Sequence, residues 1–480
     1  MNKPNVVCIC CDTFRADIVG AGQKLSFVET PNLDRLMSES VVFDSAFGEA
    51  QPTLTMRQAW FTGNRVFPFR NNPPHRGLVS HSPGWHPIPH EQTTLAEKFF
   101  EAGYVTGFST DVVHMFKPCG NYHRGFMVWD FIRGQEADPI RRGDLSAVDL
   151  TRHIPRGTEK SGFQGTLHTY LLNVQDRRGE DEYFTPQVFE SGARFVEDNY
   201  RHGPFFLWAD SFAPHEFWDP PMHFADRYFA DPETHDYLLP QMANHPDGVS
   251  VTAADIERTK ALYYGYVTFV DKWIGRLLEK LDELRLWDDT VVVFTSDHGT
   301  EVWDNERFGK NQHGPRIYNA RVPLMIRMPG ADLAGTRVNP YVLSHDLHAT
   351  LLDLAGVDYP EAIEGRSFQP LMTGEADDLH GDTIITSWGK FGCVRDRDWA
   401  MIVNTMQPDA KPELFHTAVD PYEGEDVADA NPELVAERLN MLEEFIGQSL
   451  PAHYVSVGDQ RNDCSVKRHR QIREELGMEL

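Results

Sequence analysis

The stretch "TVVVFTSDHG", residues 290–299, is the clearest buried strand in the chain. Three valines and one phenylalanine follow one another, without the polar alternation expected of a strand that faces water on one side. Such a run is typical of a parallel sheet that is covered on both faces. The run then ends in Asp297, His298 and Gly299. It therefore predicts a central strand whose carboxyl end presents an acid and an imidazole.

Other apolar runs repeat this pattern, with helical segments between them. "NVVCICCD" (5–12) ends in Asp12, and "GPFFLWADSFAPH" (203–215) breaks into a polar turn. A further strand is expected over 105–111, and helices are expected over 30–40, 93–104 and 261–284. Alternating strands and helices predict an α/β fold with an open, mostly parallel sheet and helices on both faces. Ligands of such sheets bind beyond the carboxyl ends of the strands.

From about residue 375 the pattern changes. Residues 383–404 resemble an antiparallel meander, and residues 432–450 form an amphipathic helical pattern. We therefore expect a catalytic domain over 1–375 and a smaller C-terminal α+β domain over 376–480. The polar stretch 134–182 is expected to be a solvated loop, with a lid as the alternative. The charged tail after residue 450 is a candidate exchange arm for a homo-oligomer.

The net charge of −27 argues against nucleic acid or an anionic membrane surface as a partner. No apolar run approaches the roughly 20 residues that span a bilayer. The first residues contain no small-residue cleavage site, and the six cysteines show no zinc-ribbon spacing. We therefore expect reduced thiols and a cytoplasmic location. An anionic substrate in so acidic a protein requires local cations.

Asp12 and the pair Asp297–His298 follow two strands of the predicted sheet. Because parallel strands end at the same edge, these side chains are expected to meet there. Two carboxylates and an imidazole suit Mn²⁺, Mg²⁺, Ca²⁺ or Zn²⁺. Each acid alone has a structural explanation, since Asp and Gly also end strands at turns. The order of the segments along the chain is what favours a metal site.

Several motifs carry a resemblance to a known family. They include "CCDTFRADIVG" (10–20), "TPNLDRL" (30–36), "TMRQAWFTGNR" (55–65), "FTSDHG" (294–299), "GKNQHGPRIYNARVPLMIRMPG" (309–330) and the stretch 344–374. From the first strand to about residue 420, the chain resembles the sulfatase family of the alkaline-phosphatase superfamily. The resemblance implies an alkaline-phosphatase-like fold, with a large mixed, mostly parallel sheet sandwiched by helices. It also implies a hydrolase of small anionic sulfate or phosphate esters.

Carried over to this sequence, the resemblance implies that Asp12, Asp297 and His298 hold one divalent metal ion (Mn, Zn, Ca or Mg). Family members often have two successive acids after the first strand, whereas here Thr13 follows Asp12. The usual calcium site of sulfatases is therefore less secure, although phosphonate monoester hydrolases of this family also use a single Asp there. Cys11 is a conceivable soft ligand, but its place in an apolar strand favours the core.

The family's nucleophile motif is Cys (or Ser)-x-Pro-x-Arg, followed by a helix that ends in Thr-Gly-x-Arg. Counting back from "FTGNR" places Thr53 at the Cys position, Thr55 at the Pro position and Arg57 at the Arg position. Threonine is not converted to formylglycine, so Thr53 would attack as an ordinary alkoxide and would also be a ligand of the metal. Thr55 is the alternative nucleophile. A further alternative is that Thr53 is a spectator in a catalytically silent binding protein.

The resemblance also assigns cations and proton donors. Arg57 and Lys310 would neutralise charge on the transferred group. His215 would protonate the leaving oxygen or donate a hydrogen bond to the bound anion, with a pKa near the working pH. His313, Thr110 and His114 are candidate substrate contacts. A second metal would need further ligands, and no motif assigns them; the unassigned histidines are His81, His86, His90, His114 and His123.

We therefore expect hydrolysis of a phosphodiester or a phosphonate monoester, because a threonine ester of phosphorus turns over more readily than a sulfo-threonine. The alternatives are a sulfatase that works without formylglycine and a silent binding protein. The alcohol that is released is not encoded in any motif. Pocket walls are expected from loops 66–92, 112–182 and 216–250, with Trp85, Trp129, Phe217 and Trp218 in packing or leaving-group roles.

Overall fold

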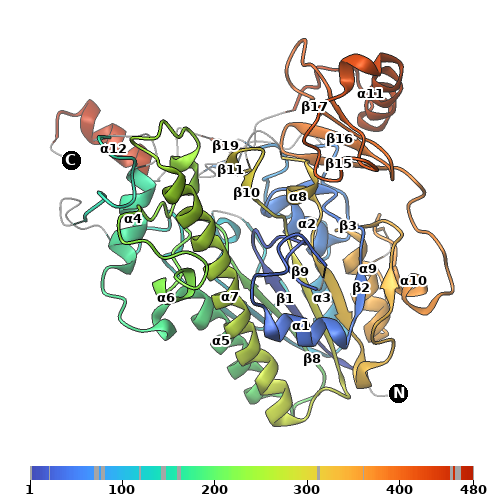
Figure 1. Ribbon diagram of the computed structural model, residues 1–480. Coiled ribbons are helices and arrows are strands. Elements are labelled where there is room, and N and C mark those ends of the chain that lie inside the picture. The colour runs from blue at the N-terminus through green and yellow to red at the C-terminus, as the bar shows by residue number, and fades with distance from the viewer. Residues whose placement is uncertain are drawn as a thin grey trace.

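Strand β9 (Thr290–Ser296) is the predicted central strand, and it lies within an eight-stranded sheet in the computed structural model of the protein (Figure 1). All seven of its residues are buried. The structure describes residues 3–20, 22–69, 75–76, 82–117, 120–141, 148–158, 164–310, 314–360, 362–454, 458–459 and 466–478.

The large sheet is mixed and mostly parallel, as predicted. Strands β1, β6, β7, β8 and β9 run parallel to one another, whereas β12 is antiparallel to both β9 and β2. The strand order is β13 (Arg337–Val338), β2 (Val41–Phe43), β12 (Leu324–Arg327), β9, β1 (Asn5–Cys11), β8 (Phe205–Ser211), β6 (Val105–Thr110) and β7 (Val128–Phe131).

Two hydrophobic layers cover the sheet, one on each face. Along β1, Val7, Ile9 and Cys11 pack into one layer, and the alternate residues of the strand pack into the other. Helices α1 (Pro31–Ser38), α4 (Gln164–Val174), α5 (Phe184–Asn199), α6 (Met222–Ala225) and α7 (Ala253–Leu284) contribute to the first layer. Helices α2 (Leu54–Thr62), α3 (Leu95–Glu101), α9 (Asp346–Ala355) and α10 (Gln369–Thr373) contribute to the second (Figure 1). Cys11 is thus a core residue, and its thiol is free.

Two of the predicted helices begin at a threonine that caps them. The hydroxyl of Thr94 accepts a hydrogen bond from the Glu97 amide at the start of α3. The hydroxyl of Thr252 does the same for the Asp255 amide at the start of α7. Threonine is a favoured N-cap because this bond satisfies an otherwise unpaired backbone amide. These caps are the ordinary arrangement against which the start of α2 is compared below.

The C-terminal region builds a second sheet, and the predicted meander and helix are confirmed. The sheet order is β18 (Glu413–Phe415), β17 (Ala400–Asn404), β16 (Phe391–Arg395), β15 (Ile384–Trp388) and β4 (Ala50–Gln51), and α11 (Pro432–Ile446) packs beside it. Strand β4 comes from the first part of the chain and runs parallel to β15. The segment just before Thr53 is therefore joined to the C-terminal sheet. The boundary at residue 375 remains a prediction.

The polar stretch 134–182 is not only a loop. Its helix α4 carries Leu167 and Tyr170 into the core, so this part of the stretch is a packed element.

The remaining strands are β3 (Ala46–Phe47), β14 (Val342–Leu343), β10 (Glu301–Asp304), β11 (Arg307–Gly309), β5 (His75–Arg76) and β19 (Gly458–Asp459), and the remaining α-helices are α8 (Ile317–Ala320) and α12 (Val466–Glu475). Within the described ranges, every helix is too short or too polar to cross a membrane.

Glu49 lies directly before β4, and its buried side chain predicts a pH-dependent stability. Its buried carboxylate accepts hydrogen bonds from the amides of Val66 (2.7 Å) and Phe67 (3.3 Å). Burial raises the pKa of Glu49 to about 7. The folded state therefore favours the protonated acid, and stability falls as pH rises from the unfolded pKa through 7.

Glu49→Gln imitates the protonated acid at every pH. We expect it to be nearly neutral at pH 5 and to raise the free energy of unfolding by about 2–3 kcal/mol at pH 8. Urea unfolding of both proteins at the two pH values measures this difference. An equal effect at pH 5 and pH 8 would contradict the assignment.

Candidate active site

Two neighbouring strands deliver three metal-ligating side chains to one edge of the sheet. Strand β9 is followed by Asp297 and His298, and β1 is followed by Asp12, with Cys11 and Ser296 paired in register just before them. All three side chains are fully buried, and one ligand atom from each lies within 4.8 Å of the others. The structure therefore brings the predicted metal ligands together.

His298 is oriented as a ligand. Its Nδ1 donates to the Gly299 carbonyl at 2.8 Å, which leaves Nε2 as the acceptor nitrogen. Nε2 is buried and makes no hydrogen bond within the described part of the chain. It lies 3.5 Å from Oδ1 of Asp12 and 3.6 Å from Oδ2 of Asp297. An imidazole held in one tautomer by a carbonyl, with its other nitrogen facing two carboxylates, fits a divalent cation.

The electrostatics of this trio support the same fit. Burial, followed by repulsion from Asp297, raises the pKa of Asp12 well above its usual range. Burial also raises the pKa of Asp297, but His298 and Arg57 outweigh it and hold that pKa below its usual range. Burial lowers the pKa of His298 to about 3, so the ring is neutral at pH 7. The raised pKa of Asp12 shows that the negative charge of the two buried carboxyl groups is only partly compensated by protein groups. A divalent cation would supply the missing positive charge and keep Asp12 ionised beside the neutral imidazole.

Thr13 occupies the position where a second acid was considered. Its backbone has a left-handed φ of 65°, and its amide donates to Oδ1 of Asp297 at 3.0 Å. Its hydroxyl donates to Oδ1 of Asp12 at 2.7 Å and accepts a hydrogen bond from Nζ of Lys310 at 3.2 Å. Thr13 therefore supports the two carboxylates with hydrogen bonds and adds no negative charge.

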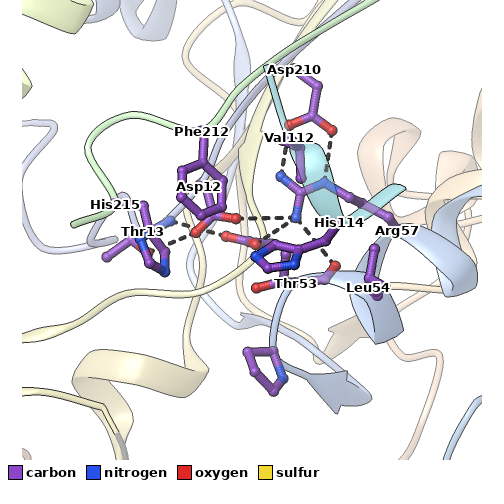
Figure 2. Close-up of polar contacts among 12 residues, drawn as sticks. Asp12, Thr13, Thr53, Leu54, Arg57, Val112, His114, Asp210, Phe212 and His215 are labelled. Carbon is purple, nitrogen blue, oxygen red and sulfur yellow. Dashed lines mark hydrogen bonds and ion pairs between the residues drawn. The ribbon is translucent and has the colours of Figure 1, made fainter. Parts of the chain in front are cut away.

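Arg57 lies among the carboxylates and is fully buried (Figure 2). Its Nε and Nη2 donate to the two oxygens of Asp210 at 2.8 and 2.7 Å. Its Nη1 donates to Asp297 at 2.7 Å, to Asp12 at 3.3 Å and to the carbonyl of Thr53 at 3.2 Å. In this structure the guanidinium binds protein groups, so the expected contact between Arg57 and the transferred group remains a prediction.

Thr53 is the N-cap of α2, but it does not cap the helix. Its φ of 49° and ψ of −88° are strained for a β-branched residue, and its hydroxyl makes no hydrogen bond to the described residues. The hydroxyls of Thr94 and Thr252 do cap their helices. The hydroxyl of Thr55, in contrast, is buried and donates to the Pro52 carbonyl at 3.0 Å. Of these two threonines near the metal ligands, the free hydroxyl belongs to Thr53.

Lys310 and His215 are held by one acid, Glu216. Nζ of Lys310 donates to Oε2 of Glu216 at 2.7 Å, and Nδ1 of His215 donates to the Glu216 carbonyl at 2.6 Å. The ring of His215 stacks on Phe212 with the ring centres 4.1 Å apart. Burial, followed by the charge of Lys310, lowers the pKa of His215 to about 4. The expected pKa near neutrality is therefore wrong: His215 is neutral at pH 7, and its Nε2 carries a lone pair.

Comparison with known proteins identifies the family to which the chain belongs. A family model described as Sulfatase matches residues 4–357. The chain belongs to the sulfatase family. A second model, described as N-sulphoglucosamine sulphohydrolase, C-terminal, matches residues 316–446. Members of the sulfatase family are hydrolases that bind a divalent metal, and this protein is accordingly a hydrolase with a candidate Asp/His metal site.

Proteins similar to this sulfatase-family protein include both sulfatases and phosphonate monoester hydrolases. It is 28% identical to an arylsulfatase of Clostridium perfringens over 413 residues, covering 79% of this chain and 81% of the relative. It is 26% identical to the multifunctional alkaline phosphatase superfamily protein PehA of Trinickia caryophylli, covering 78% and 77%. The crystal structure of a phosphonate monoester hydrolase of Agrobacterium radiobacter superimposes with a TM-score of 0.68 at 21% identity, covering 92% and 96% of the two chains, which supports the fold.

The predicted substrate contacts of this sulfatase-family protein have different outcomes. Thr110 is fully buried, and its hydroxyl accepts a hydrogen bond from the Val112 amide, so it stabilises a turn. His114 is largely buried; its Nε2 lies 3.1 Å from Glu136, and its ring faces Trp85 at 5.2 Å. His313 lies outside the described residues. Phe217 and Trp218 belong to the core, and Trp129 is exposed on β7.

In the ranges that the structure describes, Asp12, Asp297 and His298 are the one group of three or more potential ligands close enough to share an ion. His81 lies outside those ranges. One metal therefore stays the expectation for this sulfatase-family protein.

Three functional residues were not predicted. Asp210 and Glu216 hold Arg57 and Lys310, and Trp388 packs edge-on against the His298 ring with the ring centres 4.9 Å apart. The sequence signal for Asp210 was an acid that ends an apolar run, as at Asp12. Trp388 had no signal, because it reaches the site from the C-terminal sheet through the pairing of β15 with β4.

Gly314 makes room for Trp388, and this contact predicts a steric effect. A Cβ at position 314 would lie 2.1 Å from Cγ of Trp388. We expect Gly314→Ala to displace the indole from His298 and to cost about 1–3 kcal/mol of stability, as overpacking does. Tm and tryptophan fluorescence measure the effect. Gly192→Ala is the control, because its Cβ would meet Leu207 at an ordinary 3.5 Å. Equal Tm values for the two variants would refute the steric argument.

Proposed function

We propose that the protein is a metal-dependent hydrolase of phosphodiesters or phosphonate monoesters, with Thr53 as the nucleophile. The observation that carries this proposal is the free hydroxyl of Thr53 at the strained start of α2. The carbonyl of the same residue shares Nη1 of Arg57 with Asp12 and Asp297, so the nucleophile segment is tied directly to the metal ligands. A hydroxyl that gives up its usual capping bond is available for chemistry.

The reaction would proceed in two displacements. Oγ1 of Thr53 attacks phosphorus, the bond from phosphorus to the leaving oxygen breaks, and the hydroxyl proton ends on the released alcohol. Water then attacks phosphorus in the threonine ester, and the bond to Oγ1 breaks and restores the hydroxyl. A divalent cation held by Asp12, Asp297 and His298 would lower the pKa of the hydroxyl and stabilise negative charge on the transferred group.

His215 takes a different role in this proposal from the one expected. Its Nδ1–H is bound to the Glu216 carbonyl and the ring is neutral, so Nε2 is an acceptor. We assign it as the group that receives the proton of Thr53 or of water and then passes that proton to the leaving oxygen. It is a base first and an acid second.

The charges around Thr53 favour a substrate with one negative charge. Among the described residues of the site, the carboxylates of Asp12, Asp210, Asp297 and Glu216 face the cations of Arg57 and Lys310. A divalent cation would bring this group to about neutrality. Both cations are already paired with protein carboxylates, so little positive charge remains for a phosphate dianion. Phosphodiesters and phosphonate monoesters carry a single charge.

Sulfate esters also carry a single charge, so a sulfatase is the second candidate. The arylsulfatase among the relatives favours it. Against it, Thr53 lacks the route by which a formylglycine hydrate expels sulfate, namely collapse to the aldehyde. A silent binding protein is the third candidate, and the free hydroxyl of Thr53 argues against it.

A substrate panel distinguishes the three. Purified protein is loaded with Mn²⁺ or Zn²⁺ and assayed with bis-p-nitrophenyl phosphate, p-nitrophenyl phenylphosphonate, p-nitrophenyl sulfate and p-nitrophenyl phosphate. We expect the first two to give the highest kcat/KM. A preference for p-nitrophenyl sulfate would establish the second candidate. No turnover, together with thermal stabilisation by inorganic sulfate or phosphate, would establish the third.

A further inference from the structure

Asp210 stands out among the buried acids because it faces Arg57 with both oxygens. It lies near the carboxyl end of β8, between Cys10 of β1 and Thr110 of β6 in register, and it is fully buried. Its Oδ2 also accepts a hydrogen bond from the indole of Trp208 at 3.4 Å. Two parallel N–H···O bonds to a planar guanidinium fix its orientation as well as its position.

That orientation decides what the other end of Arg57 does. A guanidinium is rigid, so once Nε and Nη2 are held by Asp210, Nη1 must point away from it. Nη1 then reaches Asp12 and the carbonyl of Thr53 (Figure 2). It also donates to Asp297. One side chain on β8 thereby sets the geometry of two metal ligands and of the residue that carries the nucleophile. Asp210 itself is joined to these groups through Arg57.

We propose that Asp210 is a positioning residue, which acts through Arg57 to hold Asp12, Asp297 and Thr53 in their reactive arrangement. This inference rests on the proposed function for its effect on turnover. Its effect on metal binding follows from the structure of the site alone. Without Asp210, the guanidinium can rotate toward the carboxylates of Asp12 and Asp297 and compete with a metal for them. Loss of such a supporting group typically lowers metal affinity by about 10–100-fold.

The test compares Asp210→Asn with a matched control. We expect this variant to bind Mn²⁺ about 10–100-fold more weakly in isothermal titration, and to lower kcat by about the same factor with KM changed less than about twofold. Asp210→Glu, which keeps the charge, should recover part of both losses. The control is Glu423→Gln, which removes the charge of another fully buried partner of an arginine, Arg395, in the C-terminal sheet. It should lower Tm without changing Mn²⁺ affinity.

A double-mutant cycle with Arg57→Lys shows whether Asp210 works through Arg57. Lysine keeps the charge but cannot bind a carboxylate with two parallel bonds. We expect the losses in Mn²⁺ affinity to be strongly non-additive, with the double variant close to the weaker single variant. Additive losses would overturn the inference, and so would an Asp210→Asn protein that differs from wild type only in Tm. If Asp210→Asn does not fold, Asp210→Glu with Arg57→Lys completes the same cycle.

The metal titration separates this inference from the proposed function. If wild-type protein binds Mn²⁺ but hydrolyses no ester, the proposed function fails while the affinities of the Asp210 variants still decide the inference. If the panel identifies a substrate but the Asp210 variants bind Mn²⁺ as tightly as wild type, the inference fails and the proposed function stands.

Discussion

Thr53→Ala will abolish ester hydrolysis, lowering kcat/KM on bis-p-nitrophenyl phosphate by roughly 10⁴-fold or more, as loss of a nucleophile does in covalent catalysis. The reason is that Thr53 stands at the family's nucleophile position with a hydroxyl that does not cap its helix, whereas the hydroxyls of its two closest rivals are occupied. The hydroxyl of Thr13 is bound to Asp12, and that of Thr55 is bound to the Pro52 carbonyl. The variant should bind Mn²⁺ within a few-fold of wild type if Thr53 is mainly a nucleophile.

Two further variants make this result specific. Thr53→Ser keeps a hydroxyl at the same atom, so it should retain a substantial part of the activity. Thr55→Ala is the matched control on the same helix, and it should behave like wild type. Acid quenching during turnover, followed by peptide mass spectrometry, should find the phosphoryl group on the peptide that contains Thr53. An active Thr53→Ala protein would refute Thr53 as the nucleophile. An inactive Thr55→Ala protein, together with a phosphoryl group on Thr55 of the wild-type protein, would identify Thr55 as the nucleophile instead.

Asp297→Asn will remove both metal binding and activity. Asp297 is the carboxylate that lies closest to Nη1 of Arg57, and its pKa is held below its usual range, so it is the permanently charged ligand of the trio. Its loss should lower kcat/KM by roughly 10³-fold or more, because metal activation of the nucleophile and charge stabilisation disappear together. A chelator should likewise inactivate wild-type protein, and added Mn²⁺ should restore it.

Thermal stability gives an independent measurement of the same prediction. A ligand that binds only the folded state stabilises it by about 2.7 kcal/mol at a concentration of 100 times its Kd. Wild-type Tm should therefore rise with Mn²⁺ concentration, whereas the Tm of Asp297→Asn should not. Glu423→Gln should keep the full rise in Tm. A Mn²⁺-dependent Tm in Asp297→Asn equal to that of wild type would place the metal elsewhere.

Much of the framework of the site could be predicted from local pattern. Asp12, Asp297 and His298 each follow an apolar run, and parallel strands bring such residues to one edge of a sheet whatever the rest of the chain does. Thr53 and Arg57 were identified through the resemblance to the family's nucleophile motif, counted back from "FTGNR". The continuous apolar runs of β1 and β9 and the helical period of α7 are short-range properties, so the fold class could be predicted in the same way.

The roles of the residues were less accessible than their positions. The expected contact of Arg57 with the transferred group remains a prediction, but its hydrogen bonds to Asp210, which lies 153 positions away in the sequence, were not predicted. His215 was expected to titrate near neutrality, but burial and Lys310 lower its pKa to about 4. Both outcomes depend on which groups surround the side chain and on how far water is excluded, and neither property is written in the flanking residues.

Local patterns along the chain predict the order of strands and helices, the acids and the imidazole at the strand ends, and the threonine that stands where the family places its nucleophile. Three features are visible only in the folded chain: Thr53 leaves its helix uncapped, Asp210 holds Arg57, and Trp388 from the C-terminal sheet packs against His298. The two sets of features differ in the separation along the chain of the residues that determine them. Periodicity and strand ends are fixed by neighbours a few residues apart, whereas ion pairs, tautomers and pKa values are fixed by burial and by partners that meet only after the chain has folded.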